Sequence, residues 1–352
     1  MKNGSGIILL SFPFAAGVTA AAMTEEPFAG ALASSLAAAV LICICALSQK
    51  NCKTALWLLY LCLGAFCWCS AALCPCQERI TRASALADAL ESFLDDIPFY
   101  GEHSGAIIKA LLTGRRDSLS RSTIDIFRKS GASHILALSG LHLGIIYACL
   151  KKLLAPLGNN SFAHLLKSLL AISLCGIYTM ATGASPSIVR AFLFICINET
   201  GHALSGRYHS PPGTFCLAIT LQLAIKPTLI SSVGFQLSYL AMLGITMLYP
   251  KLRKWYPGDK KRDPIRIIWN SAAMSLSCQA FTAPVAWHHF RSIPLYFLIT
   301  NLIALPLTEI VIVSAVAAAL LQATVGCPPG LSYACGEAVQ LLEFCLETIG
   351  SF

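Results

Sequence analysis

Polar side chains stand inside long apolar runs at three places in this sequence, and such groups usually mark functional sites. The first place, residues 133–144, reads SHILALSGLHLG. Ser139 and His142 are three residues apart and share one helix face, and His134 lies within reach of it. Nucleophilic catalysis needs the histidine to accept the serine proton at about 3 Å, which an i and i+3 pair on one helix rarely achieves. Interhelical hydrogen bonds and a polar pore lining therefore stand beside the protease interpretation.

The second place, residues 183–191, reads GASPSIVRA. Gly183, Ser185 and Pro186 predict a break followed by a helix start, with Ser185 as N-cap and the proline at the first helical position. The free backbone N–H groups and the positive dipole end of such a start favour an anion. Arg190 follows one turn later and keeps its proton even in an apolar helix. It therefore needs a carboxylate, carbonyl groups or a phosphate as partner.

The third place, residues 231–241, reads SSVGFQLSYLA. It sets Gln236 between apolar neighbours, next to Phe235 and three residues before Tyr239. Asn301 adds another amide to an apolar run near the end of the chain. Each of these would be an ordinary contact in a helix bundle, but together they indicate a polar interior.

The elements that carry these residues follow from composition. The chain has 352 residues, 56% of them hydrophobic and 12% charged, whereas soluble domains carry about 25% charged residues. The apolar residues form blocks of about 20 without barrel alternation, the length of a helix that crosses a bilayer. We predict an all-α, polytopic transmembrane helical bundle of about 10–11 spans, in which Gly140 and Gly144 permit close helix contact. The spans lie near 6–23, 28–48, 54–73, 132–150, 162–181, 184–203, 213–226, 229–249, 268–287 and 296–321, and a helix near 331–350 either spans or lies flat.

The basic residues of the short loops predict the orientation. They fall on one side of the membrane if the amino terminus is cytoplasmic and every span is real: Lys2, Lys50, Lys53, Lys151, Lys152, Arg207 and the lysines and arginines of 250–267. We therefore predict a multi-pass protein with a cytoplasmic amino terminus. The chain divides into three spans in 1–78, an extracytoplasmic segment in 79–131 and the main transmembrane domain in 132–352.

The segment 79–131 has eight basic and seven acidic residues. Its first half is amphipathic, because one helical face carries Leu86, Leu90, Phe93, Leu94 and Ile97. Its second half carries four basic residues of interest, Lys109, Arg115, Arg116 and Arg121. Two interpretations stay open and are compatible: interfacial helices that lie on the membrane, and an external basic surface that meets a polyanion.

Metal and cofactor sites are not expected. The 16 cysteines include no Cys-x-x-Cys pair, and no histidine cluster accompanies them, so most of them read as small buried residues of helices. Cys74 and Cys76 flank Pro75 at a membrane edge, where oxidation outside is a weak alternative. The sequence also has no Gly-x-x-x-x-Gly-Lys phosphate-binding loop.

Four blocks, in order, resemble the ComEC competence-protein family: 133–144, 183–191, 232–241 and 301–307. The resemblance implies a channel for uptake of single-stranded DNA across the bacterial cytoplasmic (inner) membrane in natural transformation. It implies that the strand passes along polar and aromatic side chains, on which bases can stack. These are Ser139, His142, Ser185, Arg190, Phe235, Gln236, Tyr239 and Asn301.

The resemblance also implies partners. These are single-stranded DNA, membrane lipids, and separate DNA-receptor, nuclease and cytoplasmic ATPase proteins, and a homo-oligomer is compatible with it. Full-length members resemble three parts, with an external oligonucleotide-binding-type domain and a carboxy-terminal metallo-β-lactamase-like domain besides the membrane domain. The segment before residue 100 leaves no room for the first, and no His-x-His-x-Asp-His motif occurs. We therefore expect no nuclease and no enzyme activity in these residues.

Two other classes of function remain open. A secondary transporter of a small anion would also use a broken helix and a buried arginine. An intramembrane serine protease would use Ser139 with His142 or another histidine.

Overall fold

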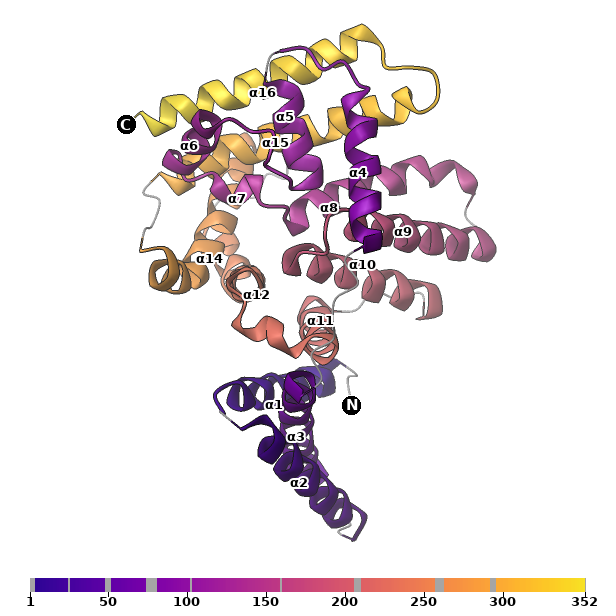
Figure 1. Ribbon diagram of the computed structural model, residues 1–352, viewed down its shortest axis with the longest axis vertical. Coiled ribbons are helices and arrows are strands. Elements are labelled where there is room, and N and C mark those ends of the chain that lie inside the picture. Colours follow the sequence, from indigo (N-terminus) through magenta and orange to yellow (C-terminus); the bar gives the residue numbers. More distant parts are fainter. Residues whose placement is uncertain are drawn as a thin grey trace. The chain divides into compact units, whose positions relative to one another are not determined.

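The fold is all-α, as predicted (Figure 1). The structure is a computed structural model, and it describes residues 4–24, 26–47, 52–73, 81–101, 103–158, 160–205, 210–256, 263–291 and 296–351. These residues form helices and connecting turns, and no strand occurs among them. They group into two compact units, one formed by residues 1–79 and 193–242 and the other by 80–192 and 243–352. This grouping reflects packing alone, and the functional division into 1–78, 79–131 and 132–352 stays a prediction.

The first unit joins the three amino-terminal helices to a segment from the middle of the chain. It contains α1 (Gly4–Ala22), α2 (Pro27–Leu47), α3 (Cys52–Leu73), the second half of α10 (Pro186–Ser205), α11 (Pro211–Ile225), a 3-10 turn (Pro227–Ser231) and most of α12 (Val233–Met247). Helix α3 packs against both α1 and α2 (Figure 1). A Cβ atom on Gly17 would lie 1.9 Å from the Leu61 carbonyl oxygen, and one on Gly64 would lie 2.1 Å from that of Phe14. Helices α1 and α3 therefore cross with their backbones in contact, which only glycine permits.

The second unit contains the remaining helices. They are α4 (Thr81–Asp95), α5 (Ser104–Thr113), α6 (Arg121–Lys129), α7 (Ser133–Leu136), α8 (Gly140–Leu153), a 3-10 turn (Ala155–Leu157), α9 (Ser161–Ala181), the start of α10, the end of α12, α13 (Tyr249–Lys254), α14 (Pro264–Phe290), α15 (Phe297–Gln322) and α16 (Pro329–Gly350). Its core is formed by α5, α15 and α16 with side chains of α4, α6, α7 and α8. Helix α16 runs along α15 and also covers α5 and α6 (Figure 1).

Four described helices are long and apolar enough to cross a membrane: Thr54–Leu73, Phe162–Ala181, Val233–Lys254 and Phe297–Gln322. Each coincides with a predicted span. Most of the other predicted spans correspond to helices that are shorter or more polar, such as α11 with 15 residues. The total of 10–11 spans stays a prediction.

One predicted span is interrupted. Residues 132–150 do not form a continuous helix, because α7 ends at Leu136 and extended backbone follows at Ala137 and Ser139 before α8 begins at Gly140. Helix α8 has 14 residues, or about 21 Å at 1.5 Å per residue, which is short of a bilayer core. The serine prefers a capping position to a helix interior, and this preference breaks the run.

The segment 79–131 is more deeply packed within the protein than a pair of helices lying on a membrane surface would be. Of the residues on the predicted apolar face, Leu94 and Ile97 are buried within the protein, whereas Leu86 is exposed. Helix α5 departs from the prediction, because nearly all of its apolar residues are buried against α15, α16 and α4. This part of the chain is therefore an integral layer of the second unit, with charges at its margin.

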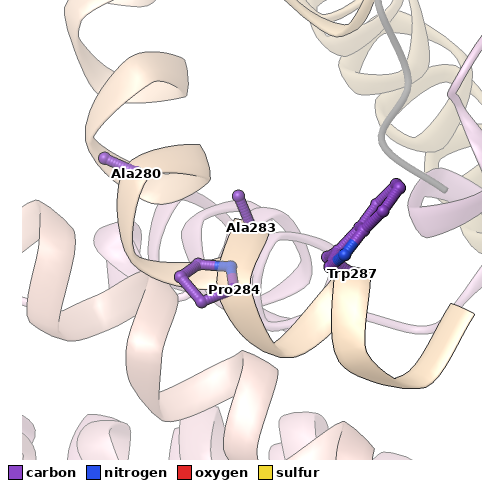
Figure 2. A pocket seen from close by; sticks show the side chains of 4 residues that line it. All are labelled: Ala280, Ala283, Pro284 and Trp287. Carbon is purple, nitrogen blue, oxygen red and sulfur yellow. The ribbon is translucent and has the colours of Figure 1, made fainter. Parts of the chain in front are cut away.

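Helix α14 runs through Pro284 without ending (Figure 2). Proline has no N–H group, so the carbonyl of Ala280, four residues earlier, has no i+4 donor. An open apolar hollow of about 470 Å³ lies at this point, lined by Ala280, Ala283, Pro284 and Trp287. Figure 2 shows that all four side chains come from this one helix. The hollow holds no charged group, and we assign it no chemistry.

Candidate polar site of the second unit

Ser139 and His142 are in contact at the start of α8. The Ser139 Oγ lies 2.9 Å from His142 Nδ1, and the Ser139 backbone N–H donates to the same nitrogen at 3.1 Å. The Ser139 Oγ also accepts the N–H of Leu141 at 3.3 Å. These bonds form a capping box in which a histidine takes the place that Glu or Gln usually fills.

The expectation that an i and i+3 pair would not meet is therefore wrong. It assumed that both residues lie inside one helix, but Ser139 is the N-cap with extended backbone, φ −117° and ψ 168°. That conformation turns its hydroxyl back over the first helical turn. Because Nδ1 accepts a backbone N–H, the neutral ring carries its proton on Nε2. That nitrogen is buried and has no hydrogen-bond partner among the described residues.

Arg190 lies against Gly140, the first residue of α8. A Cβ atom on Gly140 would be 2.8 Å from Arg190 Nη2 and 3.3 Å from the Ala191 Cβ. The arginine is buried, with 9% of its surface exposed. The predicted small-residue contact is therefore confirmed at Gly140, but a Cβ on Gly144 would meet nothing within 4 Å. One helical turn later, the position of Gly144 therefore faces open space.

The predicted break before α10 is present. Gly183 and Ala184 have φ values of +77° and +49°, and α10 begins at Pro186. Only glycine adopts such angles without strain, so the alanine is held there at a cost of about 1–2 kcal/mol. The position of Ser185 is that of the predicted N-cap, but its Oγ is buried and makes no hydrogen bond within the described residues. The side-chain cap is therefore not formed.

Asn301 lies near His134. The His134 ring is 3.2 Å from the Gly131 carbonyl through Nδ1 and is within interaction range of the Asn301 amide. The Asn301 Oδ1 is buried and accepts no hydrogen bond from the described residues. Next to it, Thr300 donates to the Ser130 carbonyl at 2.6 Å. The start of α15 is thus tied to the turn before α7.

Three of the four blocks consequently meet within the second unit. Block 183–191 touches 133–144 through Arg190 and Gly140, and block 301–307 reaches 133–144 through Asn301 and His134. Each of these three blocks carries a buried polar atom that has no hydrogen-bond partner among the described residues: His142 Nε2, Ser185 Oγ and Asn301 Oδ1. This arrangement can offer hydrogen bonds and one positive charge to a polar ligand.

The remaining block, 232–241, belongs to the first unit. Phe235 and Tyr239 pack with ring centroids 4.5 Å apart, and Phe215 meets Tyr239 edge-on at 5.6 Å. Tyr239 donates its hydroxyl to Gln222 at 2.8 Å, and Gln236 donates to the Ile230 carbonyl at 2.9 Å. Both predicted stacking rings are buried in this conformation. Stacking of bases on them therefore stays a prediction, and it requires these rings to be uncovered.

The expected basic surface is partly neutralised. Lys109 pairs with Asp95 at 2.6 Å, and Arg115 Nη1 lies 2.9 Å from both Asp88 and Glu91. These hydrogen bonds, that to Asp88 foremost, raise the pKa of Arg115. The amphipathic helix α4 carries all three carboxylates, which the sequence assigned to no partner. Arg116 and Arg121 are exposed and form no ion pair with the described residues.

Two long-range hydrogen bonds of the second unit were not predicted from the sequence. The Tyr178 hydroxyl donates to the Leu112 carbonyl at 2.6 Å, and Ser332 donates to that of Pro98. Both hydrogen bonds join residues that are far apart in the sequence, so no local sequence pattern predicts them. Within the described residues, no group of three or more His, Cys, Asp and Glu side chains could hold a metal, and the 11 cysteines with described side chains form no disulfide bonds. Cys74 and Cys76 lie outside the described residues.

Fold and site together define an all-α membrane protein with a buried polar cluster built from separated sequence blocks. The model of the family described as "Competence protein" matches residues 111–351. This chain therefore belongs to the competence-protein family. The match includes the whole of the site described above.

Relatives agree with this assignment. The chain is 27% identical over 219 residues to "ComE operon protein 3" of Bacillus subtilis, covering 62% of this chain and 26% of that protein. It is 26% identical over 221 residues to "Recombination protein 2" of Haemophilus influenzae, covering 59% and 27%. "Uncharacterized protein YcaI" of Escherichia coli is 27% identical over 247 residues, covering 68% and 31%. The chain thus spans about a quarter to a third of the relatives' length. No solved structure matches it.

Proposed function

We propose that this chain forms a membrane passage for single-stranded DNA during natural transformation, in the bacterial cytoplasmic membrane. The observation that carries the proposal is that the buried Arg190 lies against block 133–144, which block 301–307 also reaches through Asn301 and His134. Membership in the competence-protein family supports the process, and the buried polar cluster supports the role of conduit. The proposed partners are single-stranded DNA and membrane lipids, with separate DNA-receptor, nuclease and ATPase proteins. Assembly with further copies of this chain belongs to the same proposal.

A strand with one negative charge per nucleotide needs polar walls and some positive potential to cross a bilayer. Arg190 and the start of α10 supply local anion contacts, and the neutral polar groups of His142 and Asn301 supply hydrogen bonds. Few fixed charges suit this task, because tight phosphate binding would stall the strand. The sequence has no phosphate-binding loop pattern, so a partner protein supplies the energy in this proposal.

The protease alternative receives no support from the contact between Ser139 and His142. In a serine protease the imidazole accepts from the serine hydroxyl, while a third group orients its other nitrogen. Here the contacting nitrogen is already occupied by the Ser139 backbone N–H, and the other one has no partner among the described residues. A helix-capping role accounts for these contacts.

The test replaces the buried cation. Arg190→Gln keeps a polar side chain of similar reach but removes the charge, and we expect uptake of fluorescent DNA to fall about tenfold or more, as for loss of a charge-assisted contact. Lys152→Gln, which removes an exposed cation from α8, is the matched control and should retain uptake. Size-exclusion profiles in detergent establish that both variants fold. Normal uptake by the folded Arg190→Gln variant would remove the arginine from the mechanism.

A second pair of variants reaches the arginine indirectly. The new side chain of Gly140→Val would displace the Arg190 guanidinium, whereas Gly144→Val adds the same side chain where nothing lies within 4 Å. We expect the first variant alone to lose uptake. Flux of labelled small anions, measured in vesicles that contain the same variants, separates a DNA conduit from a small-anion transporter. Anion flux that depends on Arg190 without DNA uptake would favour the transporter.

A further inference from the structure

A second polar site lies at the junction of α13 and α14, away from the cluster around Arg190. A cavity of about 350 Å³ opens there, lined by Arg253, Asp263, Arg266, Ile267 and Asn270. Its volume is at the lower end of the range of small-molecule sites, about 300–1,000 Å³. All five residues belong to the second unit.

The charge of this cavity is positive. Both oxygens of Asp263 are engaged, since Oδ1 accepts the Ile265 N–H at 3.0 Å and Oδ2 accepts the Tyr256 hydroxyl. Neither Arg253 nor Arg266 forms an ion pair with any described residue. Two guanidinium groups from different helices therefore face one cavity with a single carboxylate that is already satisfied. Paired arginines of this kind recognise phosphate oxygens.

Asn270 adds a hydrogen-bonding group at the same cavity. Its Oδ1 is buried and accepts no hydrogen bond from the described residues. A ligand with a hydroxyl donor beside its phosphate would satisfy this oxygen, and an acceptor left unsatisfied is costly. The wall therefore suits a phosphate that carries a hydroxylated group.

The surroundings of the cavity are apolar and exposed. Ile267 itself is 67% exposed, and Ile265, Ile268 and Trp255 are also exposed. Tyr256 and Trp269 pack with centroids 6.4 Å apart, and Trp269 donates to the Leu252 carbonyl. Exposed isoleucines beside tryptophan and tyrosine are typical of the level where a helix leaves the hydrocarbon. A phosphate in this cavity would thus sit beside acyl chains.

We propose that the cavity formed by Arg253, Arg266 and Asn270 binds the headgroup of an anionic, hydroxyl-bearing phospholipid such as phosphatidylglycerol. The arginines contact the phosphodiester, Asn270 accepts from the headgroup hydroxyl, and the exposed isoleucines contact the acyl chains. Basic pockets beside transmembrane helices bind such headgroups in the leaflet that carries anionic lipid. This site is independent of the proposed DNA passage and of Arg190.

The experiment measures lipid retained by the full chain. Native mass spectrometry of protein purified in detergent, titrated with phosphatidylglycerol or with phosphatidylcholine, should show selective binding of phosphatidylglycerol. The double variant Arg253→Gln/Arg266→Gln should lose affinity by about tenfold for each arginine. The matched control is Lys251→Gln/Lys254→Gln, which removes two exposed charges of α13 that do not line the cavity. It should bind as the unmodified chain does.

Several results would overturn the proposal. An equal loss of affinity in the control variant would show that lipid is held by general attraction to a charged surface. Equal binding of phosphatidylcholine would show that the cavity does not distinguish between headgroups. Displacement of the lipid by inorganic phosphate would assign the cavity to a soluble anion, and displacement by an oligodeoxynucleotide would assign it to nucleic acid. If the double variant does not fold, Arg253→Gln alone, at an exposed side chain, provides the same test with about a tenfold loss expected.

Discussion

At the scale of residues, the pair Ser139 and His142 illustrates how local backbone decides what a polar pair can do. The same two side chains would be separated inside a helix, but they touch because the serine precedes the helix. The histidine ring then receives the backbone N–H that glutamate usually receives in a capping box. The contact therefore stabilises the start of α8 and places Gly140 against Arg190.

This capping role predicts a distinctive substitution pattern. Ser139→Ala should lower the free energy of unfolding by about 1 kcal/mol, because an N-cap is lost, whereas Ser139→Asp should retain most of it. His142→Gln should also be tolerated, since glutamine serves at the third position of a capping box. Thermal unfolding in detergent, together with DNA uptake, measures both effects. A serine nucleophile would lose all function in Ser139→Asp, which is the opposite outcome.

At the scale of elements, close contacts between backbones depend on particular glycines. The sequence contains these glycines but does not show which segment each of them packs against. Gly244 crosses α14 at Ser277, where a Cβ would lie 2.1 Å from the carbonyl oxygen. Gly336 of α16 packs against the bend between α4 and α5, where a Cβ would lie 2.0 Å from the Tyr100 carbonyl oxygen. The helix start at Pro186 could be predicted, because Gly183 and the proline form a local signal. The pairing of α4 carboxylates with Arg115 could not, because it depends on residues brought together by tertiary packing.

The close approach of Gly336 to the Tyr100 backbone yields a prediction for α16. Gly336→Ala should destabilise the protein by about 1–3 kcal/mol, because the new Cβ meets rigid backbone and the helix has to shift. Gly330→Ala in the same helix meets nothing within 4 Å and should be neutral, or stabilising by up to about 1 kcal/mol. Melting temperatures of the two variants in one detergent give the comparison. Equal melting temperatures would contradict the close approach.

At the scale of the whole molecule, composition alone predicts the all-α membrane class. Charge depletion and apolar blocks of bilayer length suffice for that, and the four strongest spans follow directly from hydropathy. The grouping of 1–79 with 193–242 does not follow from the sequence. It rests on contacts such as the bond from Ser11 to the Cys216 carbonyl, which no local periodicity encodes. The buried site likewise combines blocks that stand far apart in the chain.

The predicted orientation can be tested with reporter fusions. Alkaline phosphatase is active only outside the cytoplasm, so a fusion within residues 250–267 should be inactive and one within 114–120 should be active. The reason is the concentration of lysine and arginine in residues 250–267, which favours the cytoplasmic side. Five predicted spans, including the interrupted one at 132–150, separate these residues from 114–120. A cytoplasmic fluorescent reporter at the same positions should give the complementary signal. Phosphatase activity at 250–267 would reverse the assigned topology.

The discontinuous first unit sets an order of events during synthesis. Helix α1 leaves the ribosome early, yet its neighbour α11 is made only after residues 80–192 have emerged. At about 5–20 residues per second, α1 waits on the order of ten seconds for that partner. Nascent chains that stall before residue 211 therefore hold α1, α2 and α3 with an incomplete neighbour set. Because chaperones and proteases act on incompletely folded chains, we expect such intermediates to be degraded.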